Sequence, residues 1–548
     1  MAGLAAAFGS GAMTNPIEDI SRSDLILITG SNTTENHPVI ASYVKRAVTS
    51  KGTPLIVVDP RRIPITRFAT MWLRPKLGTD VAWLNGMMHV IIRDGLYDKH
   101  YVAERTVCFD SLQKTVERYT PEHTEKITGI PRGQIIEAAR LYAQAGAASI
   151  FYAMGITQHV TGTDNVKSIA NLAMLCGNVG VRGGGVNPLR GQNNVQGACD
   201  MGVLPNVYSG YQSVADPEVR GRMARAWGFD SLPETSGLTV TDMMEAARAG
   251  RLKALYVIGE NPLVSDPDLH HAMASIENLE FLVVQDIFLT ETALRADVVL
   301  PAASFAEKDG TFTNTERKVQ RVRRAVPPPG EAREDWQIIS ALAQRLGCSM
   351  TCRNSRDIME EIAQVTPSYA GIAYNRIANN GLHWPCTDSG HPGTPCLHTE
   401  TFASGKGTFH AIDYKPPAEI PDNDYPFSLT TGRVMYQYHT RTMTMRTPGL
   451  DEREPECFVE IASEDAMLHD VRNNDLLRVA SRRGFVTARA RITDSVSRGV
   501  LFMPFHYADA AANILTNPAC DPVAKIPEYK VCAVRIEKCL QGDAVDEK

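Results

Sequence analysis

The chain has 548 residues, 43% of them hydrophobic and 22% charged, so it is long enough for several globular domains. Its 56 Lys and Arg against 62 Asp and Glu give a formal net charge of −6, which offers no basic field for nucleic acid or lipid. No apolar run has the length of a membrane span, and the apolar N-terminus lacks the basic and cleavage-site pattern of a signal peptide. Small molecules and protein partners remain.

The eleven cysteines are scattered and odd in number, which fits a reducing compartment better than a disulfide framework. Cys348 and Cys352 form the tightest pair, and no second close pair lies near them to complete a four-thiolate site. We interpret them as structural thiols and predict no metal ligand and no iron–sulfur motif in this chain.

Short apolar runs, each followed by a polar turn and a helical pattern, recur in two blocks. The six runs lie at 25–29, 54–58, 149–154, 254–259, 281–285 and 297–301. This alternation is typical of parallel sheets wound in βαβ units. Apolar residues at helical spacing also predict core-facing helices over 79–94 and 335–346.

The second part of the chain changes character twice. Proline, glycine and charge dominate from about Cys386 to Asp424, which indicates a linker or an insertion, and alternating β-rich segments follow Pro426. We therefore predict an α/β fold with two doubly wound parallel-sheet domains and a C-terminal β-barrel. The predicted boundaries are 1–192 and 193–400 for the α/β domains, 401–424 for the linker and 425–548 for the barrel.

Polar side chains and glycines follow the strands of the first block, where ligands bind in open parallel sheets. The candidate ligand-binding residues are Gly30, Ser31, Asn32, Asn36, Asp59, Arg61, Gly78, Asp80, Met154, Gly155 and Gln158. Arg61 and Arg62 are suited to phosphate, and Asp59 to a ribose or a base. A carboxylate can accept two hydrogen bonds from the N1 and N2 edge of guanine, so this chemistry favours a guanosine-containing cofactor.

The second block supplies a matching set of loops. Its candidates are Gly259, Glu260, Asn261, Gln285, Asp286, Thr290 and Lys308. A single polar loop after a strand is more often a solvated turn than a ligand contact. The prediction of a cofactor site therefore depends on the order in which all these loops follow one another along the chain. The G-x-G-x-x-G pattern is absent after the first strand, which disfavours an ordinary nicotinamide-binding domain.

The segment RGQNNVQGACDMG at 190–202 has no apolar period and is rich in glycine and amides, which indicates a shaped functional loop. It resembles the substrate-side loop of molybdenum- or tungsten-dependent formate dehydrogenases, in the molybdopterin oxidoreductase superfamily. The order of the polar loops is similar to that superfamily's pattern, in which two guanylated pterins sandwich one metal across two α/β domains. The resemblance covers Met1 to about Ile536.

Two segments of the last domain resemble the superfamily's pterin clamps, LTTGRVMYQYHTRTMT at 429–444 and FHYADAAANILTNPACDPVAKIPEYK at 505–530. The residues that match these motifs are Thr431, Gly432, Arg433, Gln437, His439, Asn513, Lys525, Tyr529 and Lys530. We interpret His506 as a structural histidine bonded to backbone. The implied cofactor is bis-molybdopterin guanine dinucleotide with molybdenum or tungsten.

The resemblance implies oxidation of formate to CO2, for which the protein must orient a small carboxylate. Arg190 is the candidate catalytic residue, because a guanidinium binds a carboxylate through a planar fork and keeps its charge when desolvated. The alternative is an exposed loop arginine. Gly191 would allow a close backbone approach. The amide side chains of the loop would donate neutral hydrogen bonds to the pterin or the substrate; they are Gln192, Asn193, Asn194 and Gln196. We interpret Cys199 as a packed thiol.

The opening MAGLAAAFGSGAMTN resembles the stretch that follows the metal-binding selenocysteine or cysteine and its histidine in this family. We therefore expect that Met1 is an internal residue, that the metal ligand and the 4Fe–4S segment belong to the full-length enzyme only, and that the chain alone binds pterin weakly and does not turn over formate. The expected partners are formate and an iron–sulfur electron-transfer subunit or another redox partner.

Two alternatives stay open at this point. A nitrate reductase-like catalytic subunit shares the fold and the pterins, although it is not expected to carry the 190–202 loop. A non-catalytic fragment could keep the pterin-binding shell alone. We expect a cytoplasmic location from cysteine usage, or a periplasmic one if a twin-arginine signal preceded Met1.

Overall fold

The computed structural model describes residues 1–539, and the chain divides into two compact units. Unit 1 contains Met1–Leu189, Leu263–Ala272 and the chain from Cys396 onward, whereas unit 2 contains Arg190–Pro262 and Met273–Pro395. The polypeptide therefore leaves unit 1 twice and returns to it twice.

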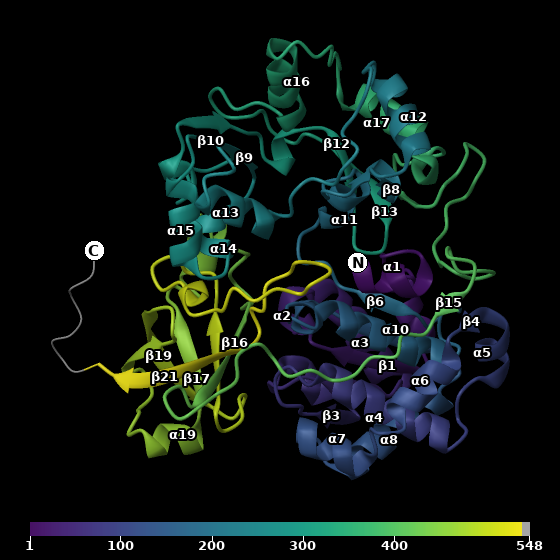
Figure 1. The fold of residues 1–548 in the computed structure, drawn as a ribbon, viewed down its shortest axis with the longest axis vertical. Helices are drawn as coiled ribbons and strands as arrows, with labels where there is room; N and C mark the ends of the chain where they lie inside the picture. The colour runs from purple at the N-terminus through teal and green to yellow at the C-terminus, as the bar shows by residue number, and fades with distance from the viewer. Residues whose placement is uncertain (540–548) are drawn as a thin grey trace. The chain divides into compact units, whose positions relative to one another are not determined.

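A five-stranded parallel sheet forms the centre of the N-terminal part of unit 1 (Figure 1). Its strands, in spatial order, are β3 (Met71–Leu73), β2 (Leu55–Val58), β1 (Leu25–Thr29), β5 (Ala148–Tyr152) and β6 (Val186–Pro188). The three predicted apolar runs of the first block are β1, β2 and β5, which are buried on both faces. Two-sided burial explains why they are continuously apolar rather than alternating.

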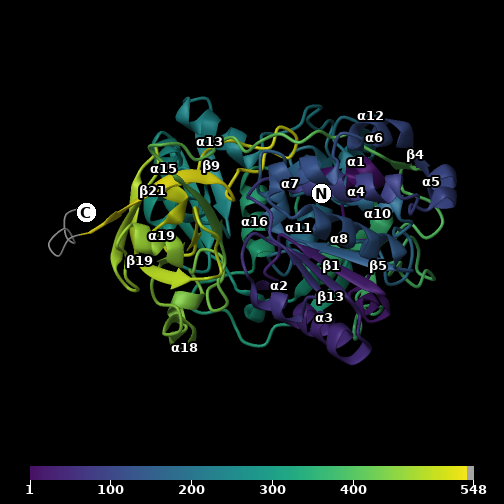
Figure 2. The same ribbon diagram turned by 90° about the horizontal axis from the view of Figure 1, so that it is seen from below.

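Alternate residues of β1 enter two different cores. Leu25 and Leu27 pack with α1 (Ala2–Phe8), α4 (Asp80–Arg93), α8 (Arg132–Gln144) and α10 (Gly162–Leu175). Ile26 and Ile28 pack with α3 (Pro38–Lys51) and the 3-10 helix η1 (Ile17–Arg22). Figure 2 shows α3 and α4 on opposite sides of β1. Each fully buried aliphatic side chain contributes about 1.5–3 kcal/mol, so both helical layers hold the sheet and its loop-bearing edge rigid.

The shorter elements of this part connect the layers. They are α2 (Thr33–Asn36), η2 (Pro64–Phe68), α5 (Lys99–Arg105), β4 (Thr106–Val107), α6 (Phe109–Val116), α7 (Pro121–Thr128) and α9 (Met154–Thr157). The separate segment Leu263–Ala272 of unit 1 contains most of α14 (Pro262–Ser265) and the first part of α15 (Leu269–Glu277). The short β15 (Gly407–Thr408) pairs in parallel with β4 and so ties the predicted linker to this domain.

The C-terminal part of unit 1 is a closed six-stranded barrel, as predicted. Its strands, in order around the barrel, are β16 (Phe427–Gly432), β20 (Val500–Pro504), β17 (Phe458–Ala462), β19 (Phe485–Thr493), β18 (Leu476–Ala480) and β21 (Cys532–Lys538). Along β19 the buried Val486, Ala488 and Ala490 alternate with more exposed residues, the period that a barrel wall requires. The helices α18 (Pro448–Asp451) and α19 (Ser463–Leu468) lie in its connections, with η7 (Thr444–Arg446) and η8 (Ala512–Ile514).

Unit 2 contains the second predicted block of strands. Its sheets are β11 (Val298–Pro301), β10 (Phe281–Asp286) and β9 (Ala254–Ile258), all parallel, and antiparallel β12 (Gly310–Thr313), β13 (Lys318–Val322) and β14 (Leu382–His383). The other elements are α11 (Val195–Asp200), β7 (Val207–Tyr208), η3 (Ser209–Tyr211), β8 (Gln212–Ser213), α12 (Pro217–Trp227), α13 (Val240–Arg248), η4 (Ala293–Arg295), η5 (Phe305–Glu307), α16 (Asp335–Arg345), α17 (Ser355–Val365) and η6 (Pro367–Tyr369). The predicted helices at 79–94 and 335–346 are α4 and α16.

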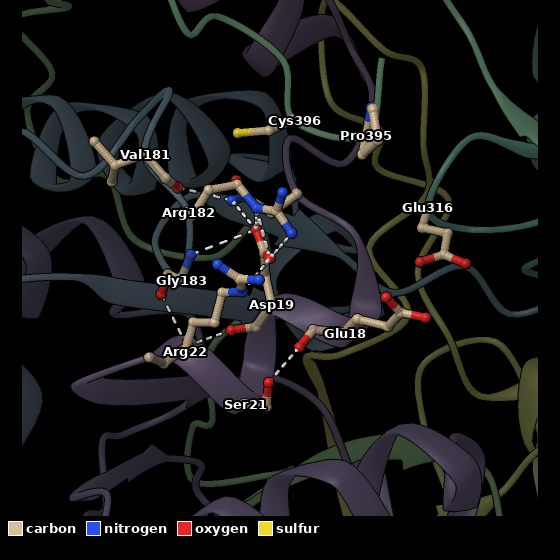
Figure 3. Close-up of polar contacts among 12 residues, drawn as sticks. Glu18, Asp19, Ser21, Arg22, Val181, Arg182, Gly183, Glu316, Pro395 and Cys396 are labelled. Atoms are coloured by element: carbon tan, nitrogen blue, oxygen red, sulfur yellow. Dashed lines mark hydrogen bonds and ion pairs between the residues drawn. The ribbon is translucent and has the colours of Figure 1, made fainter. Parts of the chain in front are cut away.

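A buried carboxylate fastens the N-terminal segment to the β6 side of the sheet (Figure 3). Asp19 accepts hydrogen bonds from Arg182 Nε at 2.7 and 2.8 Å and from Asn15 Nδ2 at 3.0 Å. Arg182 keeps solvent contact, whereas Asp19 is almost fully enclosed. Several charge-assisted bonds to one carboxylate offset the cost of burying it, which indicates a structural role for this cluster.

The structure also bears on the predictions that the chain has no disulfide framework and no membrane span. All eleven cysteines are free thiols. Between residues 1 and 539, no helix combines the length and apolar character that crossing a membrane requires.

Candidate functional site

The loops after β1 and β2 meet the barrel at a cavity of about 290 Å³ within unit 1. Its lining includes Asn32 and Arg61, which the sequence predicts as ligand-binding residues, and Glu35 and Glu460, which it does not. Arg61 is held firmly, because its Nη2 donates to Glu460 at 2.8 Å and its guanidinium lies 3.4 Å from the centre of the Phe502 ring. The cavity is thus bounded by the carboxyl edge of the sheet and by the barrel wall.

Gly30 turns the chain at the end of β1 with a φ of +56°, which L side chains rarely adopt. Its backbone lies against Gly155, which donates its N–H to the Gly30 carbonyl at 3.0 Å. A Cβ on Gly30 would come within 2.7 Å of the Gly155 carbonyl carbon. Both predicted glycines therefore permit a close backbone approach between two loops at this edge of the sheet.

Replacing Gly30 by alanine is expected to lower the free energy of unfolding by about 3–5 kcal/mol, because positive φ strain and a backbone clash add together. Gly52 is the matched control: its φ is +70°, and a Cβ there would meet nothing within 4 Å. Gly52→Ala should cost only about 1–2 kcal/mol. Urea unfolding of both variants, followed by circular dichroism, measures the difference, and equal losses would refute the close-approach argument.

Two arginines, Arg433 and Arg61, lie near the buried Lys530 in the interior of unit 1. Burial, helped by the charge of Arg433, lowers the pKa of Lys530 to about 7. Burial also lowers the pKa of Arg433, and burial with the nearby Arg433 lowers the pKa of His37 to about 4. Lys530 Nζ donates to the Thr431 carbonyl at 2.6 Å, a neutral acceptor that does not balance its charge. Asp59 acts on Lys530 in the opposite sense, but burial outweighs it, so a bound anion would stabilise the charged forms of these side chains.

Two carboxylates at the same edge of the sheet, Asp59 and Asp80, have raised rather than lowered pKa values. Burial raises the pKa of Asp59 to about 6 and that of Asp80 to about 7. Asp59 accepts from the backbone N–H of Arg61 at 2.9 Å, and Asp80 accepts from Trp83 Nε1 at 3.3 Å. Both keep spare acceptor capacity, which base or ribose donors could use. This set of donors and acceptors in unit 1 therefore fits a phosphate-containing purine ligand.

The remaining first-block candidates occupy the same edge. Ser31 Oγ bonds Thr33 Oγ1 at 2.9 Å, and the buried Asn32 Oδ1 finds no partner among residues 1–539. Asn36 ends α2, Gly78 has a φ of +71°, and Met154 and Gln158 bound α9. An orphaned buried acceptor such as Asn32 Oδ1 is costly unless a ligand supplies a donor.

The predicted clamp residues of the C-terminal part divide into two groups. Thr431 Oγ1 donates to the Tyr529 carbonyl at 2.8 Å, next to Lys530. Tyr529 and Asn513 instead bind the carbonyl of Ser265, at 3.0 and 3.1 Å, and so tie residues 263–272 to the barrel side.

Two other predicted clamp residues, Gln437 and His439, lie in the loop that follows β16. Gln437 donates to the Glu454 carbonyl at 2.8 Å, and the carbonyl of His439 contacts the ring of His506. His506 is fully buried and receives the Val434 N–H at 3.0 Å, which confirms that it is a backbone-bonded structural histidine.

The second-block candidates lie in unit 2, where most of their polar atoms are engaged. Asn261 donates to Glu291 at 2.7 Å and accepts from Thr292 Oγ1 at 2.8 Å. Gln285 donates to Asp335 at 2.7 Å, and Lys308 pairs with the same carboxylate. The others occupy exposed or turn positions: Gly259 and Glu260 are exposed, Asp286 Oδ1 accepts the Ile287 N–H, and Thr290 Oγ1 accepts the Ala293 N–H.

The 190–202 loop enters α11, and its predicted arginine is half-buried in unit 2. The backbone N–H of Arg190 donates to Thr315 Oγ1 at 3.1 Å, and its Nη2 donates to Gln196 Oε1 at 3.0 Å. Its Nε is enclosed and has no partner in the described part of the chain. An oriented guanidinium with an unused buried N–H is suited to a small anion. Gly191 and Gln192 adjoin it, partly exposed.

Sequence reasoning missed the residues that support these side chains. His37, Glu35 and Glu460 give no local signal, because single charged residues are usually solvated. Asp200 lies in the loop motif but was not chosen, and its partner Tyr369 lies 169 residues away in sequence.

Comparison with known proteins defines the class of this chain. A molybdopterin oxidoreductase family model matches residues 3–345, and a "Molydopterin dinucleotide binding domain" model matches residues 427–533. The chain belongs to the molybdopterin oxidoreductase family. Acetylene hydratase from Pelobacter acetylenicus has the same fold, with a TM-score of 0.79 at 20% identity, covering 98% of this chain and 80% of that one.

Within this family the chain is similar to formate dehydrogenase alpha subunits, which confirms the resemblance stated from sequence. It is 52% identical to the F420-dependent formate dehydrogenase 1 subunit alpha of Methanococcus maripaludis, over 98% of this chain and 79% of that protein. The corresponding subunit of Methanocaldococcus jannaschii is 52% identical, over 98% of this chain and 80% of its own length. Formate dehydrogenase H of Escherichia coli is 41% identical, over 100% of this chain and 77% of that protein.

Proposed function

We propose that this chain is a formate dehydrogenase catalytic subunit, which converts formate to CO2 and releases two electrons and one proton. The observation that carries the proposal is the similarity to formate dehydrogenase alpha subunits at 46–52% identity over 98% of the chain. The half-buried Arg190, with its unused Nε, supports it, because formate is a small carboxylate.

The cofactor we propose is bis-molybdopterin guanine dinucleotide with molybdenum or tungsten. When bound to the chain, this cofactor would supply the two-electron redox centre that side chains cannot provide. Lys530, Arg433 and Arg61 would meet its phosphates, while Asp59 and Asp80 would accept from guanosine donors. The unpartnered Asn32 Oδ1 and the depressed pKa values around Lys530 support this assignment.

Arg190 would hold the formate carboxylate in one orientation, through a guanidinium that Gln196 fixes from behind. Orientation by such a fork lowers the entropic part of the barrier, since the C–H bond is presented in one direction only. Gln192 would donate a neutral hydrogen bond to the substrate or the pterin, and Gly191 would allow a close backbone approach.

The electrons must leave through a partner, and we propose an iron–sulfur protein or another redox subunit, with a 4Fe–4S cluster in the assembled enzyme. The eleven free thiols support a reducing compartment, the cytoplasm.

The test uses the holoenzyme purified with its natural subunits. We expect formate-dependent viologen reduction, conversion of 13C-formate to 13CO2, and slower turnover of deuterated formate. Nitrate-dependent oxidation of reduced viologen without formate activity would favour the nitrate reductase alternative. A cofactor-loaded protein with neither activity would favour the non-catalytic alternative.

A further inference from the structure

A buried polar network lies behind the Arg190 guanidinium in unit 2. Asp200 is fully buried at the end of α11, one turn beyond the equally buried Gln196. Asp200 Oδ1 accepts from Gln196 Nε2 and from the Tyr211 hydroxyl, both at 2.7 Å, and Oδ2 accepts from the Tyr369 hydroxyl at 2.5 Å. Three donors from separate segments thus converge on one carboxylate.

The chemistry of this network fixes the orientation of the Gln196 amide. A carboxylate with three donors around it acts as an acceptor, so the amide must present its NH2 group to Asp200. Its carbonyl oxygen then faces Arg190, which can only donate, at 3.0 Å. The amide cannot be flipped without facing acceptor to acceptor at one end and donor to donor at the other.

The amide also separates two opposite charges that would otherwise pair. A direct contact between Asp200 and Arg190 would use the guanidinium fork and neutralise it. With Gln196 between them, Arg190 is oriented by a neutral group, keeps its charge, and leaves Nε without a protein partner. This arrangement suits an arginine that has to bind an anion from solution.

We propose that Gln196 and Asp200, held by Tyr211 and Tyr369, are positioning residues that set the orientation of Arg190 for its carboxylate substrate. The proposal rests on the proposed function of Arg190, and it adds the residues that orient Arg190 and thereby set its affinity for formate. The network belongs entirely to unit 2, so it does not depend on the cofactor-binding residues of unit 1.

The test measures KM and kcat for formate separately in the holoenzyme. Gln196→Met keeps the side-chain length and removes both polar ends, and we expect KM to rise about 10-fold while kcat changes less than about 3-fold. Tyr369→Phe, which removes one donor to Asp200, should raise KM about 3-fold. Gln196→Glu, which places a carboxylate against Arg190, should raise KM more than Gln196→Met.

Asn278→Ala is the matched control, because Asn278 Nδ2 donates to the Ala247 carbonyl at 2.8 Å elsewhere in unit 2, on elements that carry no residue of the network. Its KM should stay within about 2-fold of the wild-type value. A second readout needs no turnover: the rate at which phenylglyoxal modifies Arg190, read by mass spectrometry, should change in Gln196→Met and Tyr369→Phe but not in Asn278→Ala. This readout keeps the test valid if a variant loads less cofactor.

The variant Arg190→Lys distinguishes a failure of the proposed substrate-binding role of Arg190 from a failure of the positioning role of Gln196 and Asp200. If Arg190→Lys leaves KM unchanged, the proposed role of Arg190 is wrong. If it raises KM while Gln196→Met and Tyr369→Phe match the control in both readouts, the positioning proposal alone is overturned. If the proposal holds, Gln196→Met adds less than about 2-fold to KM in the lysine background, because the fork that it orients is already gone.

Discussion

Replacing Arg190 by lysine is expected to lower kcat/KM for formate by about 10²- to 10³-fold in the holoenzyme, chiefly through KM. Lysine keeps the charge but loses the planar fork and the bond to Gln196. Each charge-assisted hydrogen bond that is lost costs about 1.5–3 kcal/mol, and two losses at about 1.5–2 kcal/mol each correspond to the expected range.

Steady-state kinetics with formate, compared with Arg220→Lys, checks this result. Arg220 lies in the same unit and pairs with the exposed Glu234 at 3.3 Å, so its replacement should change kcat/KM less than about 2-fold. Equal effects of the two substitutions would contradict the assignment of Arg190 to substrate binding.

Replacing Lys530 by methionine is expected to have opposite effects on the protein without cofactor and on ligand binding. The buried ammonium is poorly compensated, so removing it should raise the melting temperature of the cofactor-free protein. Affinity for GDP, a minimal probe of a guanosine phosphate, should fall about 10- to 100-fold, because a phosphate loses its cationic partner.

The pH dependence gives this prediction a definite sign. The folded-state pKa of Lys530 is about 7, below the usual value of 10.5, so the unfolded chain binds more protons between these limits. The contribution of Lys530 to stability is therefore complete above pH 10.5 and is lost as the pH falls to about 7. Lys530→Met should abolish that part of the slope, measured by thermal unfolding in the absence of cofactor.

Lys538→Met is the control, since Lys538 lies on β21 with a surface partner, Asp475, at 2.7 Å. Neither its melting temperature nor its GDP affinity should change appreciably. If Lys530→Met lowers the melting temperature and leaves GDP binding intact, the side chain is structural and not part of a phosphate site.

Local periodicity predicted the strands of the first parallel sheet and of the barrel, because burial on two faces or on one face imposes patterns that are visible within a few residues. The strands of the second block were also predicted from apolar runs, although β9 and β11 are largely exposed. The strands of both blocks lie within one or two residues of the predicted runs. The four-part division of the chain stays a prediction. The division into two compact units has no such signal, since the return of 263–272 to unit 1 depends on bonds such as that from Tyr529 to Ser265.

The candidate site could be predicted only where its residues stand in a recognisable loop. Arg190 and Asn32 follow strands or glycines, and a polar loop in such a place indicates function. The orientation of Arg190 depends on Tyr369, which no local pattern connects to it. The pKa values of Lys530 and Asp59 depend on burial, which emerges only when the barrel packs against the sheet.

The position of Lys530 near the end of the chain has a consequence for biosynthesis. Gly30 and Asp59 leave the ribosome early, whereas Lys530 and strand β21, which pairs with β16 and β18 to close the barrel, are made about 500 residues later. The buried surroundings of Lys530 are therefore incomplete until β21 has been made and the barrel has closed. Under the proposed cofactor assignment, insertion follows the synthesis of Lys530, so the cofactor would be delivered to a folded but empty protein rather than to the growing chain.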